Sequence, residues 1–229
     1  MSEIAATTGN PARAEGHPPA PPPSGYPKHR IEGLTDGIFA VAMTLLAIEL
    51  KFPENVQITT NDELGQAMLH LVPHLISWPL SFAILAIFWF AHQRAFVHLR
   101  TVDGKLVAIN FLSLGFVTLL PFSTMLIGGY APLFASHAVY AANMAILAWL
   151  SLWQIRHIAS HPELTHGALT EAFIRGARFR NWSLITCAGL AVALAWIAPR
   201  FGSMAYMAMA VIAPLSRRWS RSDAPPRTS

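Results

Sequence analysis

The first long apolar segment of the chain carries ionisable side chains in a setting where they are costly. Asp36 lies about one helical turn inside the apolar run over residues 33–50, and Arg30 precedes that run. A charge inside a bilayer is expensive unless it is paired or faces water, so both residues are candidates for a functional role, with a simple anchor pair at the membrane edge as the alternative. Six residues apart on a helix, they do not share a face, and we expect each to reach a partner on another helix.

Histidines at helical spacing form a second set of candidates. His70 and His74 stand four residues apart, and three more follow near a polar connection: His157, His161 and His166. An i, i+4 pair can bind a metal ion, but neither set has the additional intramembrane ligands that a metalloenzyme requires. Hydrogen-bonded or interfacial histidines are the simpler interpretation, and we expect no metal site. No nucleophile elbow, phosphate-binding glycine loop or zinc motif occurs, so the sequence gives no positive evidence for catalysis.

These side chains must be positioned by a chain that is more apolar than a soluble domain. Of the 229 residues, 53% are hydrophobic and only 12% are charged, whereas about 25% are charged in a typical soluble domain. The mean hydropathy is +0.41. So few charges cannot cover the surface of a soluble protein of this size. The composition therefore excludes a soluble enzyme and a disordered chain, and it indicates a polytopic membrane protein.

Apolar runs separated by short polar breaks predict an all-α fold with six transmembrane helices. Their approximate extents are 33–50, 67–93, 105–129, 132–155, 181–199 and 201–216. About twenty apolar residues cross a bilayer, so the first five suffice, whereas the sixth is marginal and can also be a re-entrant helix. The polar connection over 158–180 predicts an amphipathic helix at the membrane surface.

The segments outside these helices have a distinct composition. Residues 1–28 contain a cluster of prolines that is incompatible with helix or sheet, which predicts a disordered cytoplasmic tail. The transmembrane domain is then expected to cover 29–216, and a basic cytoplasmic tail to cover 217–229.

Basic residues are distributed asymmetrically between the ends of the predicted helices. With a cytoplasmic N-terminus and six helices, fourteen of the sixteen Lys and Arg residues fall on the cytoplasmic side, and only Lys51 and Arg200 fall outside. This satisfies the positive-inside rule and places both termini in the cytoplasm. The net charge of +4 therefore reflects topology, and we expect no nucleic acid partner because no basic helix with interleaved aromatics occurs. The same partition places four acidic residues at the outer face: Glu49, Glu54, Asp62 and Glu63.

The first segments of the chain resemble the transmembrane protein 175 family, which comprises lysosomal potassium channels and their prokaryotic relatives. The stretch Arg30-x-x-x-Leu34-Thr35-Asp36 is similar to the family's first-helix signature Arg-x-x-x-Phe-Ser-Asp. Further similar elements are Trp78-Pro79, Ser81-Phe82, Trp89-x-x-His92, Asn110, Leu120-Pro121-Phe122 and Tyr140-x-x-Asn143. The resemblance covers about residues 28–155.

The resemblance implies a potassium channel without a carbonyl-lined filter, in which the first helices of a homotetramer line a central pore. By motif position, Val41 would form the narrowest apolar ring, Leu45 and Ile48 would form further layers outward, and Thr44 would favour potassium. A narrow apolar neck can gate by dewetting. The outer acidic residues would concentrate cations at its mouth.

The same resemblance implies a structural network at the inner end of the pore helix. Arg30 and Asp36 are expected to contact polar groups of the second and third helices, with His92 and Asn110 as candidate partners. Thr35 and Trp89 are the remaining members of this predicted network.

The expected function is passive K+ flux through the plasma membrane, with no enzymatic activity and no cofactor. The implied partners are the permeant ion, the lipid bilayer and other copies of the chain. Ile38, Val41, Leu45 and Ile48 share one helix face, but such a stripe is more often a packing face than a pore lining. A weakly selective proton or sodium leak, a histidine–metal membrane enzyme and a non-conducting structural protein stay open as alternatives.

Overall fold

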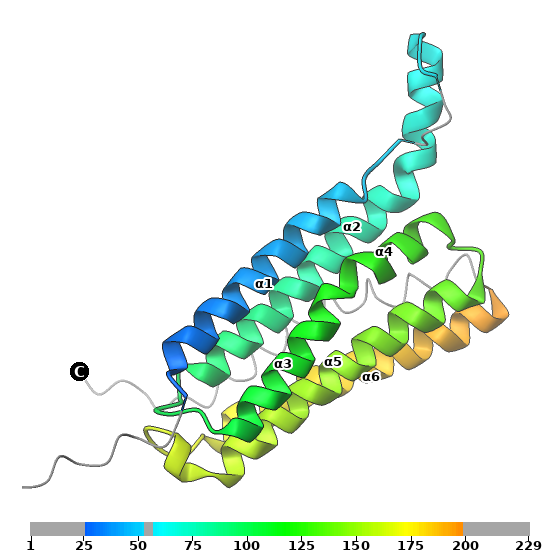
Figure 1. The fold of residues 1–229 in the computed structure, drawn as a ribbon. Helices are drawn as coiled ribbons and strands as arrows, with labels where there is room; N and C mark the ends of the chain where they lie inside the picture. The colour runs from blue at the N-terminus through cyan, green and yellow to red at the C-terminus, as the bar shows by residue number, and fades with distance from the viewer. Residues whose placement is uncertain (1–25, 53–56, 199–229) are drawn as a thin grey trace, which may run out of the picture.

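The structure is a computed structural model that describes residues 26–52 and 57–198. In these ranges the chain forms long α-helices and one short 3-10 helix (Figure 1). The elements are α1 (Lys28–Ile48), α2 (Asn61–Phe96), α3 (Gly104–Thr118), α4 (Leu120–Gly129), α5 (Phe134–Ser160), η1 (Pro162–Leu164) and α6 (Glu171–Ile197).

Five segments of the described chain are long and apolar enough to cross a membrane. They are α1, α2, α3 together with α4, α5, and α6. An all-helical membrane protein is therefore confirmed, and the first five predicted spans each correspond to one of these segments. The predicted sixth span over 201–216, most of the N-terminal tail and the C-terminal tail lie outside the described residues.

Prolines act differently in the second and third spans. Helix α2 continues through Pro73 and Pro79 over its 36 residues. The third span instead breaks at Leu119, where α3 ends and α4 begins with Pro121 in its first turn. Proline has no N–H to donate and fits the first turn of a helix, so Pro121 accounts for the interruption.

The polar connection before the last described span differs from the prediction. Helix α5 extends to Ser160, η1 follows, and α6 already begins at Glu171, where Thr170 Oγ1 accepts the N–H of Phe173 as a cap. Residues 171–180 are therefore the first turns of the spanning helix α6, and no separate surface helix forms here. The cap at Thr170 explains the early start, because it satisfies a free N–H of the first turn.

The helices pack as a bundle with α3 and α4 between two pairs. Helices α1 and α2 lie side by side on one side, α5 and α6 pair on the other, and the broken third span lies between them (Figure 1). The main core contains side chains of all the spanning helices, including Phe39, Leu85, Leu120, Met144 and Leu184. A second cluster around Phe96 and Leu106 fills the end of the bundle where α1 begins.

Candidate functional site

Helix α1 has one face in the bundle and one face outside it. Its buried residues, at intervals of three or four, are Ile31, Thr35, Phe39, Ala42 and Leu46. This spacing is one stripe of an α-helix, and it packs α1 against α2, α3 and α4. The opposite face of α1 is left for lipid, solvent or another subunit.

The predicted pore residues lie on this outer face of α1. Val41, Leu45 and Ile48 are 55%, 39% and 53% exposed, respectively. Thr44 lies among them and is also exposed. Ile38, which the sequence placed on the same stripe, is instead half-buried and packs against the core. Ile38 therefore does not belong to the outer face of α1, which one turn before Val41 presents the exposed Gly37.

The hydroxyl of Thr44 has a defined orientation on the outer face. Its Oγ1 donates a hydrogen bond of 2.8 Å to the carbonyl oxygen of Val41, one turn back in the helix. Because the only hydroxyl proton is used in that bond, the lone pairs of Oγ1 are available to a cation or to its hydration water.

Asp36 lies near the start of α1 and is held by two donors from α2. The indole Nε1–H of Trp89 donates to Asp36 Oδ1 over 2.8 Å, and the side-chain amide of Gln93 donates to the same oxygen. The expected partners of Asp36 were His92 and Asn110, and that expectation is wrong. Trp89 and Gln93 are one turn apart, so they present both donors on the face of α2 that meets α1.

The other residues of the predicted network form a separate chain of hydrogen bonds. His92 Nε2 donates to Asn110 Oδ1 over 2.9 Å, Asn110 Nδ2 donates to Thr35 Oγ1 over 3.0 Å, and Thr35 Oγ1 donates to the Ile31 carbonyl oxygen over 2.8 Å. All three side chains are buried. These hydrogen bonds connect α2 through α3 to α1. Each donor in the series has an acceptor, so the three bonds form one continuous network.

Arg30 does not join either arrangement. It is exposed at the first turn of α1, and its guanidinium makes no hydrogen bond or ion pair within residues 26–52 and 57–198. The nearby Lys28 instead donates to the Leu99 carbonyl oxygen over 3.0 Å. Lys28 and not Arg30 therefore ties the start of α1 to the loop after α2.

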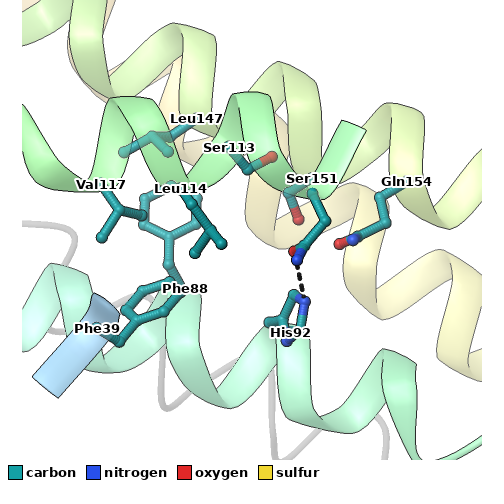
Figure 2. A pocket seen from close by; sticks show the side chains of 10 residues that line it. Phe39, Phe88, His92, Ser113, Leu114, Val117, Leu147, Ser151 and Gln154 are labelled. Atoms are coloured by element: carbon teal, nitrogen blue, oxygen red, sulfur yellow. Dashed lines mark hydrogen bonds between the residues drawn. The ribbon is translucent and has the colours of Figure 1, made fainter. Parts of the chain in front are cut away.

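A small pocket lies beside His92 and Asn110. Its volume is about 30 Å³, enough for a water molecule. Figure 2 shows apolar side chains such as Phe88 and Leu147 at one end and Ser113, Ser151 and Gln154 at the other. Gln154 was not a predicted site residue, since a single glutamine in the fourth apolar segment gives no spacing signal.

A second polar cluster, further along the bundle, was also not predicted. Ser81 and Tyr140 share a hydrogen bond of 3.0 Å, and Thr124 donates to Ser81 Oγ over 2.8 Å. Asn143 donates to Ser123 over 3.2 Å. These bonds connect α2, α4 and α5. Two of the motifs quoted from the sequence, Ser81-Phe82 and Tyr140-x-x-Asn143, contain these residues, but the motifs did not reveal that they meet.

Three of the predicted acidic residues lie at the end of α1 and in the first turn of α2. Glu49 is the C-cap of α1, and Asp62 lies in the first turn of α2. Glu63 closes a capping box by accepting the N–H groups of Thr59 and Thr60 over 2.8 and 2.9 Å. Glu54 lies outside the described residues.

His74 and His157 lie in close contact with residues from other parts of the bundle. A Cβ on Gly128 would lie 2.6 Å from the ring of His74, so glycine allows α2 and α4 to approach closely there. His157 Nε2 lies 2.8 Å from Asp103 Oδ2. No group of three or more His, Cys, Asp or Glu residues suited to a metal occurs in the part of the chain that the structure describes.

Asp103 caps α3 and lies outside the spans. Partial burial acts to raise the pKa of its carboxyl, but the hydrogen bonds from the Leu106 N–H and from His157 outweigh it and lower that pKa below its usual value. The carboxylate thus joins the N-terminus of α3 to the C-terminal end of α5.

Comparison with known proteins gives a consistent result. The model of the endosomal/lysosomal potassium channel TMEM175 family matches residues 30–121, which cover most of α1 and all of α2 and α3. A potassium channel of Chamaesiphon minutus is 37% identical over 101 residues, which are 44% of this chain and 49% of that channel. The endosomal/lysosomal proton channel TMEM175 of Rattus norvegicus is 26% identical over 205 residues, which are 82% of this chain and 40% of that relative. The matched part thus spans half or less of the length of these two relatives.

A solved structure shares the fold over nearly its full length. The crystal structure of a lysosomal potassium-selective channel TMEM175 homolog from Chamaesiphon minutus matches with a TM-score of 0.69 and 28% identity. The match covers 86% of this chain and 98% of that chain. The chain therefore matches the TMEM175 family model over its first spans, and its fold is similar to that of a solved TMEM175 homolog.

Proposed function

We propose that this chain is a potassium-selective channel in which helix α1 of four subunits lines the pore. The observation that carries the proposal is the outer face of α1, where Val41, Thr44 and Leu45 point away from the core of their own subunit. An apolar face alone is equally suited to lipid. The exposed threonine among these apolar residues supports a pore, because the lone pairs of its hydroxyl can meet water or a cation there.

The proposed conduction mechanism follows from these side chains. Val41, Leu45 and Ile48 of four subunits would form successive apolar rings, and a narrow apolar neck expels water until it widens. Thr44 Oγ1 would offer its free lone pairs to the dehydrating cation between these rings. The hydrogen bonds of Thr35 and Asp36 to α2 and α3 would hold the inner part of α1 while its outer part moves.

The positions of the basic residues support the proposed orientation in the membrane. Nine of the ten Lys and Arg residues in the described ranges lie at or near the end of the bundle where α1 begins, and Lys51 alone lies toward the other end. The positive-inside rule then assigns the start of α1 to the cytoplasm. Glu49 and Asp62, at the opposite end, would attract cations to the outer mouth of a plasma-membrane channel.

Potassium is the proposed permeant ion because the bacterial relative of Chamaesiphon minutus is named a potassium channel. The mammalian relative is named a proton channel, so a proton leak is the second candidate. Neither mechanism needs a cofactor or a catalytic residue.

Reconstitution of the full chain tests the proposal. Purified protein in liposomes should carry K+ faster than Na+ along equal gradients, and native mass spectrometry should give a tetramer. Pyranine fluorescence in the same vesicles measures proton flux. Proton flux without K+ flux would replace the proposal with the proton channel, and an inert monomer would overturn both.

A further inference from the structure

An open groove of about 740 Å³ lies on the side of the bundle formed by α5 and α6, beside the N-terminus of α3. Figure 1 places these two helices on the opposite side of the bundle from α1. The groove is lined by three basic side chains and three tryptophans: Lys105, Arg156, Arg178, Trp149, Trp153 and Trp182. It contains none of the residues proposed for ion conduction.

The basic side chains of the groove are not neutralised by acidic neighbours. No aspartate or glutamate lines the groove. Lys105, Arg156 and Arg178 are exposed, and none of them forms an ion pair with a carboxylate within the described ranges. The carboxylate of Asp103 is bonded to His157, which lines the groove. The groove is therefore a site of positive charge suited to an anion.

The tryptophans and arginines of the groove lie at different distances from the end of the bundle where α5 ends and α6 begins. On α5, Arg156 follows Trp153 by three residues toward the helix end. On α6, Arg178 precedes Trp182 by four residues, nearer the helix start. The end of α5 and the start of α6 are at the same end of the bundle, so both tryptophans lie deeper than both arginines. At about 1.5 Å per residue, the offset along the helices is about 4.5–6 Å.

We propose that this groove binds an anionic phospholipid of the adjacent leaflet. Its phosphate would lie between Arg156, Arg178 and Lys105, where guanidinium groups can donate paired hydrogen bonds to phosphate oxygens. Its glycerol backbone and upper acyl chain would lie along the exposed rings of Trp149 and Trp182, which suit the boundary between headgroups and hydrocarbon. Basic pockets between transmembrane helices are a general solution for anionic headgroups.

Charge argues against the C-terminal segment of this chain as the occupant. Residues 199–229 carry five arginines and a single acidic residue, Asp223. Such a segment would be repelled by the three basic side chains of the groove. The depth offset of the tryptophans also fits a molecule with a polar head and an apolar tail better than it fits a soluble anion.

Lipid selectivity of the full-length protein tests the proposal. The protein is purified in mild detergent, incubated with equal amounts of phosphatidylglycerol and phosphatidylcholine, and analysed by native mass spectrometry. We expect phosphatidylglycerol to be retained on each subunit in preference to phosphatidylcholine, and an excess of inorganic phosphate not to displace it. Equal retention of the two lipids would overturn the proposal, and displacement by inorganic phosphate would reassign the groove to soluble anions.

Matched variants locate the bound lipid. Arg156→Gln with Arg178→Gln should weaken phosphatidylglycerol binding about 25-fold, because each arginine near an anionic lipid contributes roughly a fivefold factor. The control is Arg175→Gln, an exposed arginine of α6 that does not line the groove. Equal lipid binding by the double variant and the control would contradict the assignment, as would loss of the oligomer in the double variant alone. The comparison of phosphatidylglycerol with phosphatidylcholine on the wild-type protein tests the proposal even if the double variant does not fold.

Discussion

Replacing Thr35 by valine should destabilise the protein although the two side chains have almost the same shape. The hydroxyl of Thr35 accepts a hydrogen bond from Asn110, and Asn110 is 0% exposed. Valine removes the acceptor and leaves the Asn110 Nδ2 donor buried among apolar atoms. The carbonyl of Ile31 loses only the extra bond from the hydroxyl, since it keeps its place in the helix.

The magnitude follows from the two effects in the structure. A buried donor left without an acceptor costs about 1–3 kcal/mol in proteins, whereas a hydrogen bond between membrane helices averages about 0.6 kcal/mol with a maximum near 1.7. We therefore expect Thr35→Val to lower the free energy of unfolding by about 1–2 kcal/mol. For a chain of this size, this corresponds to a decrease in the thermal midpoint of about 2–8 °C.

The assay is thermal unfolding in detergent followed by tryptophan fluorescence, as a double-mutant cycle with Asn110→Leu. The two single changes remove the same bond, so the double variant should be less destabilised than the sum of the singles by about 0.6–1.7 kcal/mol. Thr118→Val is the control, because the Thr118 hydroxyl is exposed and bonds only to the Gly115 carbonyl of its own helix. Strict additivity, or an equal effect of Thr118→Val, would refute the reasoning.

Three further changes test other parts of the structure. Asp36→Ala removes the acceptor of two α2 donors and should abolish assembly or K+ flux; normal tetramers with normal flux would contradict this role. Gly128→Ala places a Cβ 2.6 Å from the His74 ring and should cost about 1–3 kcal/mol, whereas Gly115→Ala meets nothing within 4 Å and should be neutral or stabilising; equal midpoints would show that α2 and α4 can separate. Hydrogen bonds lower the pKa of Asp103 despite partial burial, so its stabilising contribution is complete above the ordinary aspartate pKa of about 3.9 and is lost as the pH falls below it. Asp103→Asn should therefore lower the thermal midpoint at pH 7 and reduce its decrease between pH 5 and 3, and an unchanged pH profile would contradict the assignment.

Much of the fold could be predicted from composition and hydropathy. Long apolar runs indicate membrane helices whatever their sequence, so the first five spans were located to within several residues of their described ends, apart from the early start of α6. That start was missed because residues 171–180 carry four charged side chains, and hydropathy does not register a charged helix that continues into a span. The cap at Thr170 was the local signal that would have indicated it.

Partners within the candidate site were harder to predict than its members. Asp36 was singled out because a carboxylate in an apolar run is costly, but its donors depend on how α1 and α2 are rotated against each other. Spacing gives the face of each helix and not the rotation, so Gln93 was missed and His92 was assigned to the wrong acceptor. Ile38 shows the same limit, because periodicity placed it on the outer stripe and packing turned it toward the core.

The direct test of the central proposal is K+ and Na+ flux in proteoliposomes for α1 variants and their matched controls. Val41→Ser makes the neck more polar and should raise K+ flux, and Thr44→Val removes a hydroxyl and should lower the ratio of K+ to Na+ flux. Val139→Ser on α5, a valine of similar exposure at 42%, and Thr118→Val on α3, with the same i−3 hydroxyl bond, should both leave flux and ratio at the wild-type values. Wild-type flux and ratio in both α1 variants would remove this helix from the pore.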